Sequence, residues 1–329
     1  MSETLLSHAV GAVKRARRTA GRIRRRVERI NTVPALGTRG RARPTLKPVH
    51  LSVLGGRTFN LAVPSPRRSA DVASAFLVFE RGTQRHVVAM ELEPQPHGPT
   101  LLTATAGLRH ARHDGPEASG PRLTDGVWRL TVEISDTNGR RARFGITAPT
   151  PHVADGPTLS APPSPSSGAV FRPMRSVDGQ SMIKVTGPRL GAELIAFDLR
   201  WDRVSVRGRL LAGGSPAEFT TEAVRRGGGM NPVTIPTEWD GDRFAFDVPL
   251  DAMAKGRAKG VWDIQMRSGR NRIKIGRRLS DVRHPKKVFR TPFRTIATEG
   301  GALLRVHAHL TAAGNLAVSS TVISTKETV

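Results

Sequence analysis

The chain has 329 residues and a formal net charge of +25, with 52 Lys and Arg against 27 Asp and Glu. It contains no Cys and no Tyr, so disulfides, thiolate zinc sites and a cysteine nucleophile are excluded. The length predicts two ordinary domains. This charge favours polyanionic partners, namely nucleic acid, anionic lipid or a phosphate-rich polymer, although the Arg-rich composition typical of a GC-rich genome also raises it.

Residues 1–31 are predicted to form a basic amphipathic helix. Apolar residues recur at three- or four-residue steps from Leu6 to Ile30. Its basic face includes Lys14, Arg15, Arg18, Arg22, Arg25, Arg26 and Arg29. Such a helix binds an anionic membrane or the acidic groove of a partner, packs on its own domain, or serves as a nucleic-acid arm. Neither a secretory signal nor a transmembrane run is evident, so we expect a cytoplasmic protein, peripheral at the inner membrane face where the helix attaches it.

Residues 32–47, rich in Gly, Pro and basic side chains, are predicted to be a linker. From residue 48 onward the apolar period changes to two, in short runs separated by Gly, Pro and Ser clusters. This pattern predicts an all-β protein with antiparallel β-sandwiches at residues 48–187 and 188–322, followed by a tail at 323–329. No helical stretch separates the runs, so a parallel α/β fold is not expected.

The chain repeats itself. A unit of strand, turn and strand with Trp at its third position occurs twice, once with Trp128 and once with Trp262. The two Trp residues are 134 positions apart. A second pair of segments, Phe171–Val185 and Phe293–Val306, is shifted by about 121–122 residues. Self-similarity of this kind indicates two tandem copies of one β-domain. In alternating strands, both Trp side chains are predicted to anchor the cores.

Few residues offer catalytic or metal chemistry. Asp240 and Asp242 flank Gly241 as in the metal-binding Asp-x-Asp of many glycosyltransferases, but an ordinary hairpin turn is favoured. His110 and His113 with Asp114 are expected in a surface loop, because no second ligand cluster follows. We therefore predict no cofactor and no metal site.

Other polar and aromatic candidates are weighed in the same way. His307 and His309 share one face of a strand and are expected to face solvent or a partner. The glycine clusters at 213–214 and 227–229 are not followed by a helix, so flexible loops are predicted rather than phosphate cradles. Trp201 and Trp239 lie in predicted turns and are the candidates for stacking on sugars.

A cationic strip is predicted in the second copy. Alternation places Arg270, Arg272 and Lys274 on one face of a strand hairpin, with Ile273 and Ile275 on the other. The strip suits a phosphodiester backbone, and a solvated basic face is the alternative. The candidate polyanion-binding residues are Arg267, Arg270, Arg272, Lys274, Arg277 and Arg278.

A family resemblance rests on several short motifs. These are Phe244–Leu250, Gly260–Ile264 and Ile273–Leu279, and the ending Phe293–Thr295, Leu303–Val306 and Gly314–Val318. Their order resembles the tandem immunoglobulin-like β-sandwich module that lies C-terminal to the catalytic domain in bacterial wall-teichoic-acid glycosyltransferases and glycerophosphotransferase-type proteins. The resemblance spans about residues 46–322, both copies. It implies two immunoglobulin-like sandwiches that act in oligomerisation and polymer engagement.

The resemblance transfers no catalytic residue, because catalysis in that family belongs to a nucleotide-sugar domain that this sequence does not show. We therefore expect a non-catalytic accessory or scaffold module that engages an anionic cell-envelope polymer or its synthetic machinery. The expected partners are an anionic glycopolymer or membrane surface, with a glycosyltransferase and a second copy of the chain as further candidates. A transferase of cell-wall glycopolymer synthesis and a basic protein that binds nucleic acid nonspecifically are the alternatives, so enzymatic activity is left open.

Overall fold

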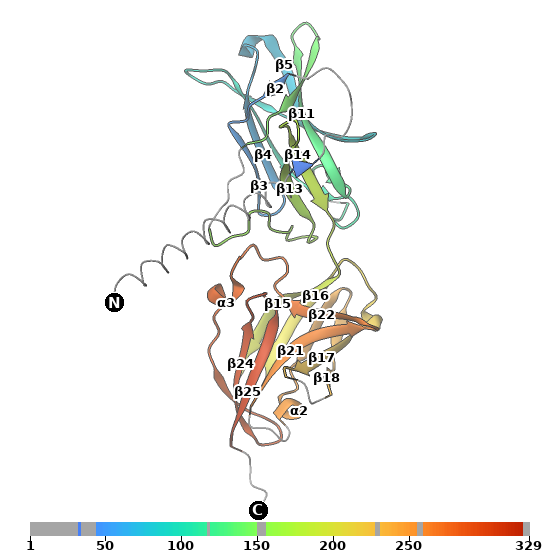
Figure 1. Ribbon diagram of the computed structural model, residues 1–329, viewed down its shortest axis with the longest axis vertical. Coiled ribbons are helices and arrows are strands. Elements are labelled where there is room, and N and C mark those ends of the chain that lie inside the picture. The colour runs from blue at the N-terminus through green and yellow to red at the C-terminus, as the bar shows by residue number, and fades with distance from the viewer. Residues whose placement is uncertain are drawn as a thin grey trace, which may run out of the picture.

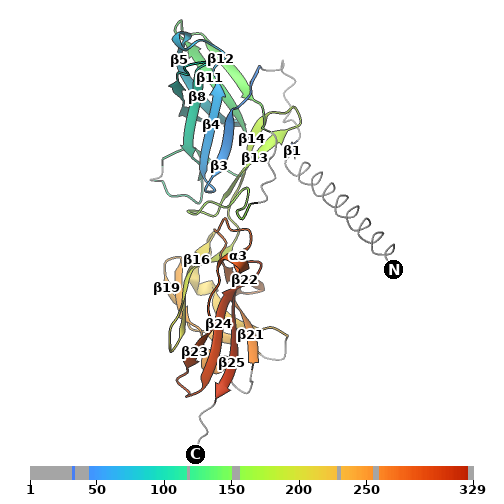
Figure 2. The same cartoon turned by 90° about the vertical axis from the view of Figure 1, so that its left-hand side faces the viewer.

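The structure, a computed structural model, describes residues 32–33, 44–116, 119–149, 156–227, 231–254 and 259–324. The predicted helix at 1–31, with its basic face, and the end of the predicted tail lie outside these residues. The all-β class is confirmed, because strands dominate the described chain and its two α-helices span only a few residues each. Two bodies lie one above the other (Figures 1 and 2). We call them the first unit (residues 32–187) and the second unit (residues 188–324).

Short strands make up the first unit. In chain order it contains β1 (Thr32–Val33), β2 (Thr45–Leu46), β3 (His50–Leu54), β4 (Thr58–Pro64), the 3-10 turn η1 (Ser69–Asp71), β5 (Val72–Arg81), β6 (Gln84–Ala89), β7 (Glu91–Glu93), β8 (Leu101–Gly107), β9 (Arg109–His110), β10 (Arg122–Leu123), β11 (Gly126–Asp136), β12 (Arg141–Ile146), β13 (Val170–Ser176) and β14 (Ser181–Thr186).

The second unit adds two short helices to the same kind of strands. It contains β15 (Gly191–Leu199), β16 (Val204–Leu211), the 3-10 turn η2 (Pro216–Glu218), β17 (Thr220–Arg225), β18 (Val233–Ile235), β19 (Glu238–Asp240), β20 (Arg243–Asp247), α2 (Leu250–Ala254), β21 (Lys259–Ser268), β22 (Asn271–Gly276), α3 (Pro285–Val288), β23 (Arg294–Ala297), β24 (Leu303–Leu310) and β25 (Leu316–Ser324). Neither helix is long and apolar enough to cross a membrane.

Two sheets enclose the core of the first unit. An 8-stranded sheet runs in the order β1-β13-β14-β11-β12-β2, with β5 beside β11 and β6 beside β5. A 4-stranded sheet runs in the order β3-β4-β8-β7. Alternate side chains of both sheets form one apolar cluster, so the sheets pack face to face. Phe59 of β4 contacts Phe79 of β5 across the layer, with ring centroids 5.4 Å apart. Trp128 is fully buried there, as predicted.

The second unit has its own core. Its strands form an 11-stranded sheet in the order β19-β20-β16-β15-β22-β21-β25-β24-β23, with β17 beside β21 and β18 beside β17. Side chains of β16 and β20 share one apolar cluster with those of β21 and β25, so the sheet folds over itself. The two halves are joined by the parallel pair β15 and β22. Trp262 is fully buried, as predicted.

The two Trp strands have equivalent neighbours. One edge of β11 pairs with β5, and one edge of β21 pairs with β17. The other edge of β11 pairs with β14 and then with β12, and Ile183 of β14 lies opposite Trp128. The other edge of β21 pairs in the same way with β25 and then with β22, and Val318 of β25 lies opposite Trp262. The counterpart of β14 is therefore β25, and the alignment of Phe171–Val185 with Phe293–Val306 was wrong by one strand. Short apolar runs resemble one another, and only the pairing shows which of them adjoins the Trp strand.

Parts of the predicted linker belong to the first sheet. β1 pairs in parallel with β13, and β2 pairs in parallel with β12. Leu46 of β2 is buried in the first core. The expectation of a continuous linker over residues 32–47 therefore fails at these two pairs of residues, where edge hydrogen bonding and one buried leucine outweigh a loop-like composition. The predicted boundary near residue 188 falls between the two apolar clusters.

Candidate anion-binding cleft

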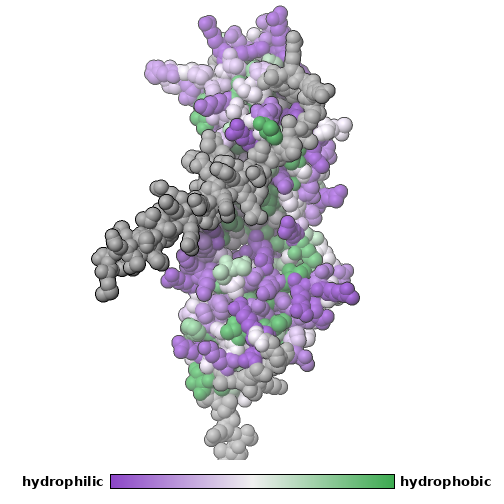
Figure 3. All heavy atoms as spheres, viewed as in Figure 1, coloured by the Kyte–Doolittle hydropathy of each residue, from purple (hydrophilic) through white to green (hydrophobic). Residues whose placement is uncertain are grey.

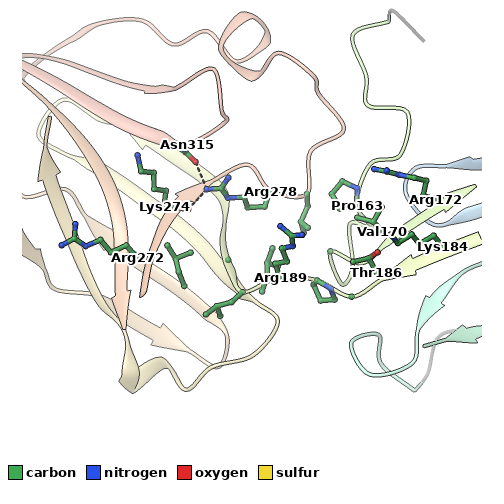
Figure 4. A pocket seen from close by; sticks show the side chains of 18 residues that line it. Pro163, Val170, Arg172, Lys184, Thr186, Arg189, Arg272, Lys274, Arg278 and Asn315 are labelled. Carbon is green, nitrogen blue, oxygen red and sulfur yellow. Dashed lines mark hydrogen bonds between the residues drawn. The ribbon is translucent and has the colours of Figure 1, made fainter. Parts of the chain in front are cut away.

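A cleft of about 740 Å³ lies where the two units meet. Its cationic lining residues are Arg172, Lys184, Arg189, Arg272, Lys274 and Arg278, and no Asp or Glu lines it among the residues that the structure describes. Figure 4 shows Arg172 and Lys184 on the first unit, Arg278 and Lys274 on the second, and Arg189 between them. On the face seen in Figure 3, hydrophilic side chains cover both units with only scattered hydrophobic spots. The cleft therefore brings six cationic side chains together.

The first-unit wall is one face of the β13 and β14 hairpin. Arg172 is paired directly with Lys184, and Val170 with Thr186, so all four side chains project from the same face into the cleft lining. The opposite face of the hairpin, which includes Phe171, is buried in the core. Like charges placed directly opposite each other on a sheet are destabilising. An anion between Arg172 and Lys184 would relieve this repulsion.

The second-unit wall begins with β22. Ile273 and Ile275 point into the core, so Arg272 and Lys274 point outward, as the alternation predicted. The Lys274 Nζ lies 3.1 Å from Asp263 Oδ2. Burial alone would raise the pKa of Asp263, but hydrogen bonds from Arg226 and Lys274 outweigh it and hold that pKa below its usual value. Lys274 is therefore partly neutralised.

The segment after β22 is fixed by a buried carboxylate. Glu193 accepts the backbone N–H groups of Arg278 and Leu279, the latter at 2.9 Å. Burial raises the pKa of Glu193, although these two hydrogen bonds oppose the shift. The guanidinium of Arg278 donates to the Lys274 carbonyl at 2.8 Å and to Asn315 Oδ1 at 2.6 Å, and burial lowers its pKa. Arg278 thus lines the cleft with its Nη2 group already bonded to protein acceptors.

Four cleft cations are not neutralised by the described protein. Arg172, Lys184, Arg189 and Arg272 have neither an ion pair nor a side-chain hydrogen bond with any residue that the structure describes. All four are exposed. Exposed guanidinium and ammonium groups without protein acceptors are available to phosphate or carboxylate oxygens, and Arg adds a bidentate geometry.

One wall of the cleft is a loop held by Asp114. Asp114 is only 6% exposed and accepts the backbone N–H of His110 at 2.6 Å. It also accepts the hydroxyls of Ser166 at 2.7 Å and Ser167 at 3.1 Å. Gly168, the next residue, lines the cleft. The sequence placed Asp114 in a surface loop, which is wrong, because its polar partners come from residues some 50 positions away and bury it.

His110 takes part in the same corner of the first unit. Its side chain is 1% exposed, and its Nε2 lies 3.6 Å from Asp125 Oδ1, beyond hydrogen-bond distance. Asp125 accepts the backbone N–H of Gly187, which lines the cleft. Burial lowers the pKa of His110, so the neutral imidazole is favoured. The expectation of a surface loop is therefore also wrong for His110.

The units contact each other beside the cleft. Leu159 donates its N–H to the Asp281 carbonyl at 2.6 Å, and Arg283 donates its N–H to the Pro157 carbonyl at 2.8 Å. The guanidinium of Arg209 donates to the Pro165 carbonyl at 2.7 Å. The described residues 157–165 before β13 therefore reach the second unit and shape the cleft between the two units.

The predicted polyanion-binding residues fall into different settings. Arg272, Lys274 and Arg278 line the cleft, whereas Arg267, Arg270 and Arg277 do not. Arg267 is paired with the buried Glu222. The guanidinium of Arg277 lies over the Phe289 ring, 5.3 Å from its centroid. Sequence reasoning missed Arg172, Lys184 and Arg189, because the only signal for the first two was their outward position in alternating strands of another unit.

The two Trp candidates for sugar stacking differ. Trp201 lies in the turn between β15 and β16 and is 78% exposed, so it stays a candidate. Trp239 lies in β19 rather than in a turn, and its ring packs edge-on against Phe244 with centroids 5.7 Å apart. Part of Trp239 is thus used by the core, which leaves less of its face for a sugar. The Asp240–Asp242 turn connects β19 to β20 as an ordinary hairpin, as expected.

The remaining candidates also have structural settings. His307 and His309 are half-buried rather than solvent-facing. The Phe293 ring packs at a tilt on His307, with centroids 4.3 Å apart, and His307 stacks on His309 with centroids 4.6 Å apart. Burial lowers the pKa of His309. Gly213 and Gly214 both have positive φ angles in a loop, as expected. Within the described residues, no group of three or more His, Asp or Glu side chains could hold a metal ion.

No protein-family profile and no curated protein sequence matches this chain. Among solved structures, it is similar to fragment 217–571 of S. aureus TarS, with 8% identity and a TM-score of 0.31 over 70% of this chain and 62% of that one. A longer S. aureus TarS structure gives 7% identity and a TM-score of 0.31, over 70% of this chain and 39% of that one. A pullulanase complexed with maltotriose from Anoxybacillus sp. LM18-11 gives 6% identity and a TM-score of 0.17, over 69% of this chain and 24% of that one. The chain spans less than two thirds of each, and scores this low carry no argument about function.

Proposed function

We propose that this protein is a binding module for a phosphate-rich polymer of the polyol-phosphate (teichoic-acid) type, which it holds in the cleft between its units. The observation that carries the proposal is the set of Arg172, Lys184, Arg189 and Arg272, exposed cations without an acceptor among the described residues. The resemblance of the sequence motifs to sandwiches associated with wall-teichoic-acid synthesis favours this polymer over other polyanions.

Binding is favoured over catalysis by the chemistry of the lining. The described lining offers guanidinium, ammonium and amide donors together with apolar side chains, but neither imidazole nor carboxylate. Phosphoryl or glycosyl transfer would need a positioned general acid or base. An accessory or scaffold role in making or handling the polymer is therefore the form of the proposal. The cytoplasmic membrane face and the attachment through residues 1–31 belong to the same proposal.

The test compares two triple variants that remove the same charge. The cleft variant is Arg172→Gln, Lys184→Gln, Arg272→Gln, and its control is Arg68→Gln, Arg141→Gln, Arg243→Gln. The control arginines are exposed, lie outside the cleft and have no ion pair among the described residues. Binding to poly(glycerol phosphate) is titrated over a range of salt concentrations, with calorimetry to verify that each variant folds.

The cleft variant should bind the polymer at least tenfold more weakly than the control. Its log affinity should also depend less on log salt, with the slope reduced by about 2, since each phosphate contact with a flexible strand contributes roughly 0.7. Equal weakening in both triple variants would show that charge acts from the whole surface and not from the cleft.

Two further arms separate the partners. Removing residues 1–31 should abolish binding to anionic vesicles while polymer binding survives. Duplex DNA should bind more weakly than the polymer, and its affinity should fall equally in the cleft and control variants. A preference for duplex DNA that depends on the cleft would favour the nucleic-acid alternative instead.

A further inference from the structure

The cleft cations form two groups on different units. Arg172 and Lys184 project from the β13 and β14 hairpin of the first unit. Arg272 and Lys274 project from β22 of the second unit. Arg189 lies in the connection between the units, and Figure 4 shows it between the two groups. The positive charge is therefore divided between the two units.

Apolar side chains lie between the two cationic groups. The lining also contains Pro163, Val170, Pro188, Leu190, Leu211 and Leu279. Gly168 is packed among them, because a Cβ at that position would lie 3.1 Å from the Leu279 side chain and 3.4 Å from that of Pro188. An apolar floor between two cationic ends does not stabilise a continuous line of negative charge. It suits a ligand whose charges are separated by uncharged carbon.

The size of the cleft points the same way. Its volume of about 740 Å³ lies within the roughly 300–1,000 Å³ range of sites that enclose whole small molecules. A single phosphate group fills little of such a space and could meet the donors of one wall only. A ligand that uses both walls must carry at least two anionic groups.

We infer that the cleft binds a linear phosphodiester through at least two phosphates at once, one on each unit, with the uncharged spacer over the apolar floor. This inference rests on the proposed function and names its ligand class. Two weak contacts joined by a short spacer act as one strong contact, because the second is made at an effective concentration in the mM range. The ligand consequently ties the two units together.

The test compares ligands of increasing length. Glycerol 1-phosphate is titrated alongside linear glycerol-phosphate oligomers that contain two, three and four phosphates. The full chain should bind the three-phosphate oligomer about 100-fold or more tightly than the monophosphate, within the 10²–10⁴ range that linked contacts provide.

Two one-sided variants test the two-wall requirement. Arg172→Gln, Lys184→Gln removes the first-unit pair, and Arg272→Gln, Lys274→Gln removes the second-unit pair. Each should reduce oligomer binding to the affinity of the monophosphate, and calorimetry verifies that each variant folds. Arg68→Gln, Arg243→Gln is the charge-matched control and should keep the gain with length.

A distance measurement reports the coupling of the units. The chain contains no Cys, so Val177→Cys in the first unit and Ile323→Cys in the second give one labelled pair. Both sites are exposed, at 67% and 56%. The spin-label distance distribution should narrow when the three-phosphate oligomer is added and stay unchanged with glycerol 1-phosphate.

The outcomes separate this inference from the proposed function. If cleft variants weaken binding but oligomers bind no more tightly than the monophosphate, or one-sided variants keep the gain with length, the two-wall inference is overturned and the proposed function stands. If no glycerol-phosphate polymer or oligomer binds in a cleft-dependent way, both are overturned.

Discussion

Asp114 offers the sharpest test of how the cleft wall is built. Its buried carboxylate accepts three hydrogen bonds, from the His110 backbone N–H and from the Ser166 and Ser167 hydroxyls. We predict that Asp114→Ala destabilises the first unit, because a small apolar side chain leaves these donors without their acceptor. The loop that ends at Gly168 should also loosen, which would weaken ligand binding in the cleft.

The magnitude follows from what each donor loses. The Ser166 hydroxyl lies 2.9 Å from the Ser164 hydroxyl and can donate to it, whereas the Ser167 hydroxyl accepts from the N–H of Ala169 at 3.4 Å and has no second acceptor among the described residues. The N–H of His110 keeps none and is buried, which costs about 1–3 kcal/mol. Together with the loss of the two charge-assisted hydrogen bonds from Ser166 and Ser167, the free energy of unfolding should fall by about 3 kcal/mol. That corresponds to roughly 6–12 °C in Tm, at ~2–4 °C per kcal/mol for a unit of this size.

The assay is calorimetric unfolding of the full chain. Asp178→Ala is the control, since Asp178 is exposed in the turn between β13 and β14 and has no partner among the described residues. Asp114→Asn should lose only about 1 kcal/mol, because its amide oxygen still accepts and serine hydroxyls can accept from its amide. A loss in Asp114→Ala no larger than in Asp178→Ala would refute the idea that this carboxylate holds the wall.

Two further predictions concern titration and close packing. Burial lowers the pKa of His110, and of two other histidines, so the unfolded chain takes up their protons first. The contribution of these neutral histidines to the free energy of unfolding should be fully present above about pH 6.5. It should decrease as the pH drops below that value, by up to ~1.4 kcal/mol per pH unit for one group. Urea unfolding at several pH values should show a shallower fall of the free energy of unfolding in His110→Gln than in the unsubstituted protein. An identical fall in both proteins would show that His110 does not contribute to this pH dependence. Gly276→Ala should cost about 1–3 kcal/mol, because its Cβ would lie 2.4 Å from the backbone oxygen of Gly314. Thermal unfolding checks this against Gly115→Ala, whose Cβ would meet nothing within 4 Å, and equal Tm values would refute the close-packing argument.

Alternation along the chain was enough to predict the strands and the orientation of their side chains. The period of two places Trp128 and Trp262 inward and Arg272 and Lys274 outward, as the structure confirms. The buried face of a strand is apolar along its whole length, so the positions of the apolar residues in the sequence identify the face that is buried. The all-β class follows from the same pattern together with the missing helical stretches.

Tertiary structure alone decided which outward faces meet. Arg172 and Arg272 are 100 positions apart and lie on different units, yet both line one cleft. Arg267 belongs to the same basic segment as Arg272 but is paired with Glu222 on a neighbouring strand. Alternation cannot reveal such partners, because they depend on strand pairing and on the contact between units.

The burial of Asp114 and His110 also could not be predicted from the sequence alone. A segment rich in His, Gly and Pro has the composition of a surface loop, but here the Asp114 carboxylate accepts hydrogen bonds from the His110 backbone and from a distant pair of serines. A polar side chain can be buried when its hydrogen bonds are made, and the partners that allow this are brought together only by the fold. The sequence by itself therefore determined the strands, the cores and the excess of positive charge, while the fold determined where that charge is free to bind.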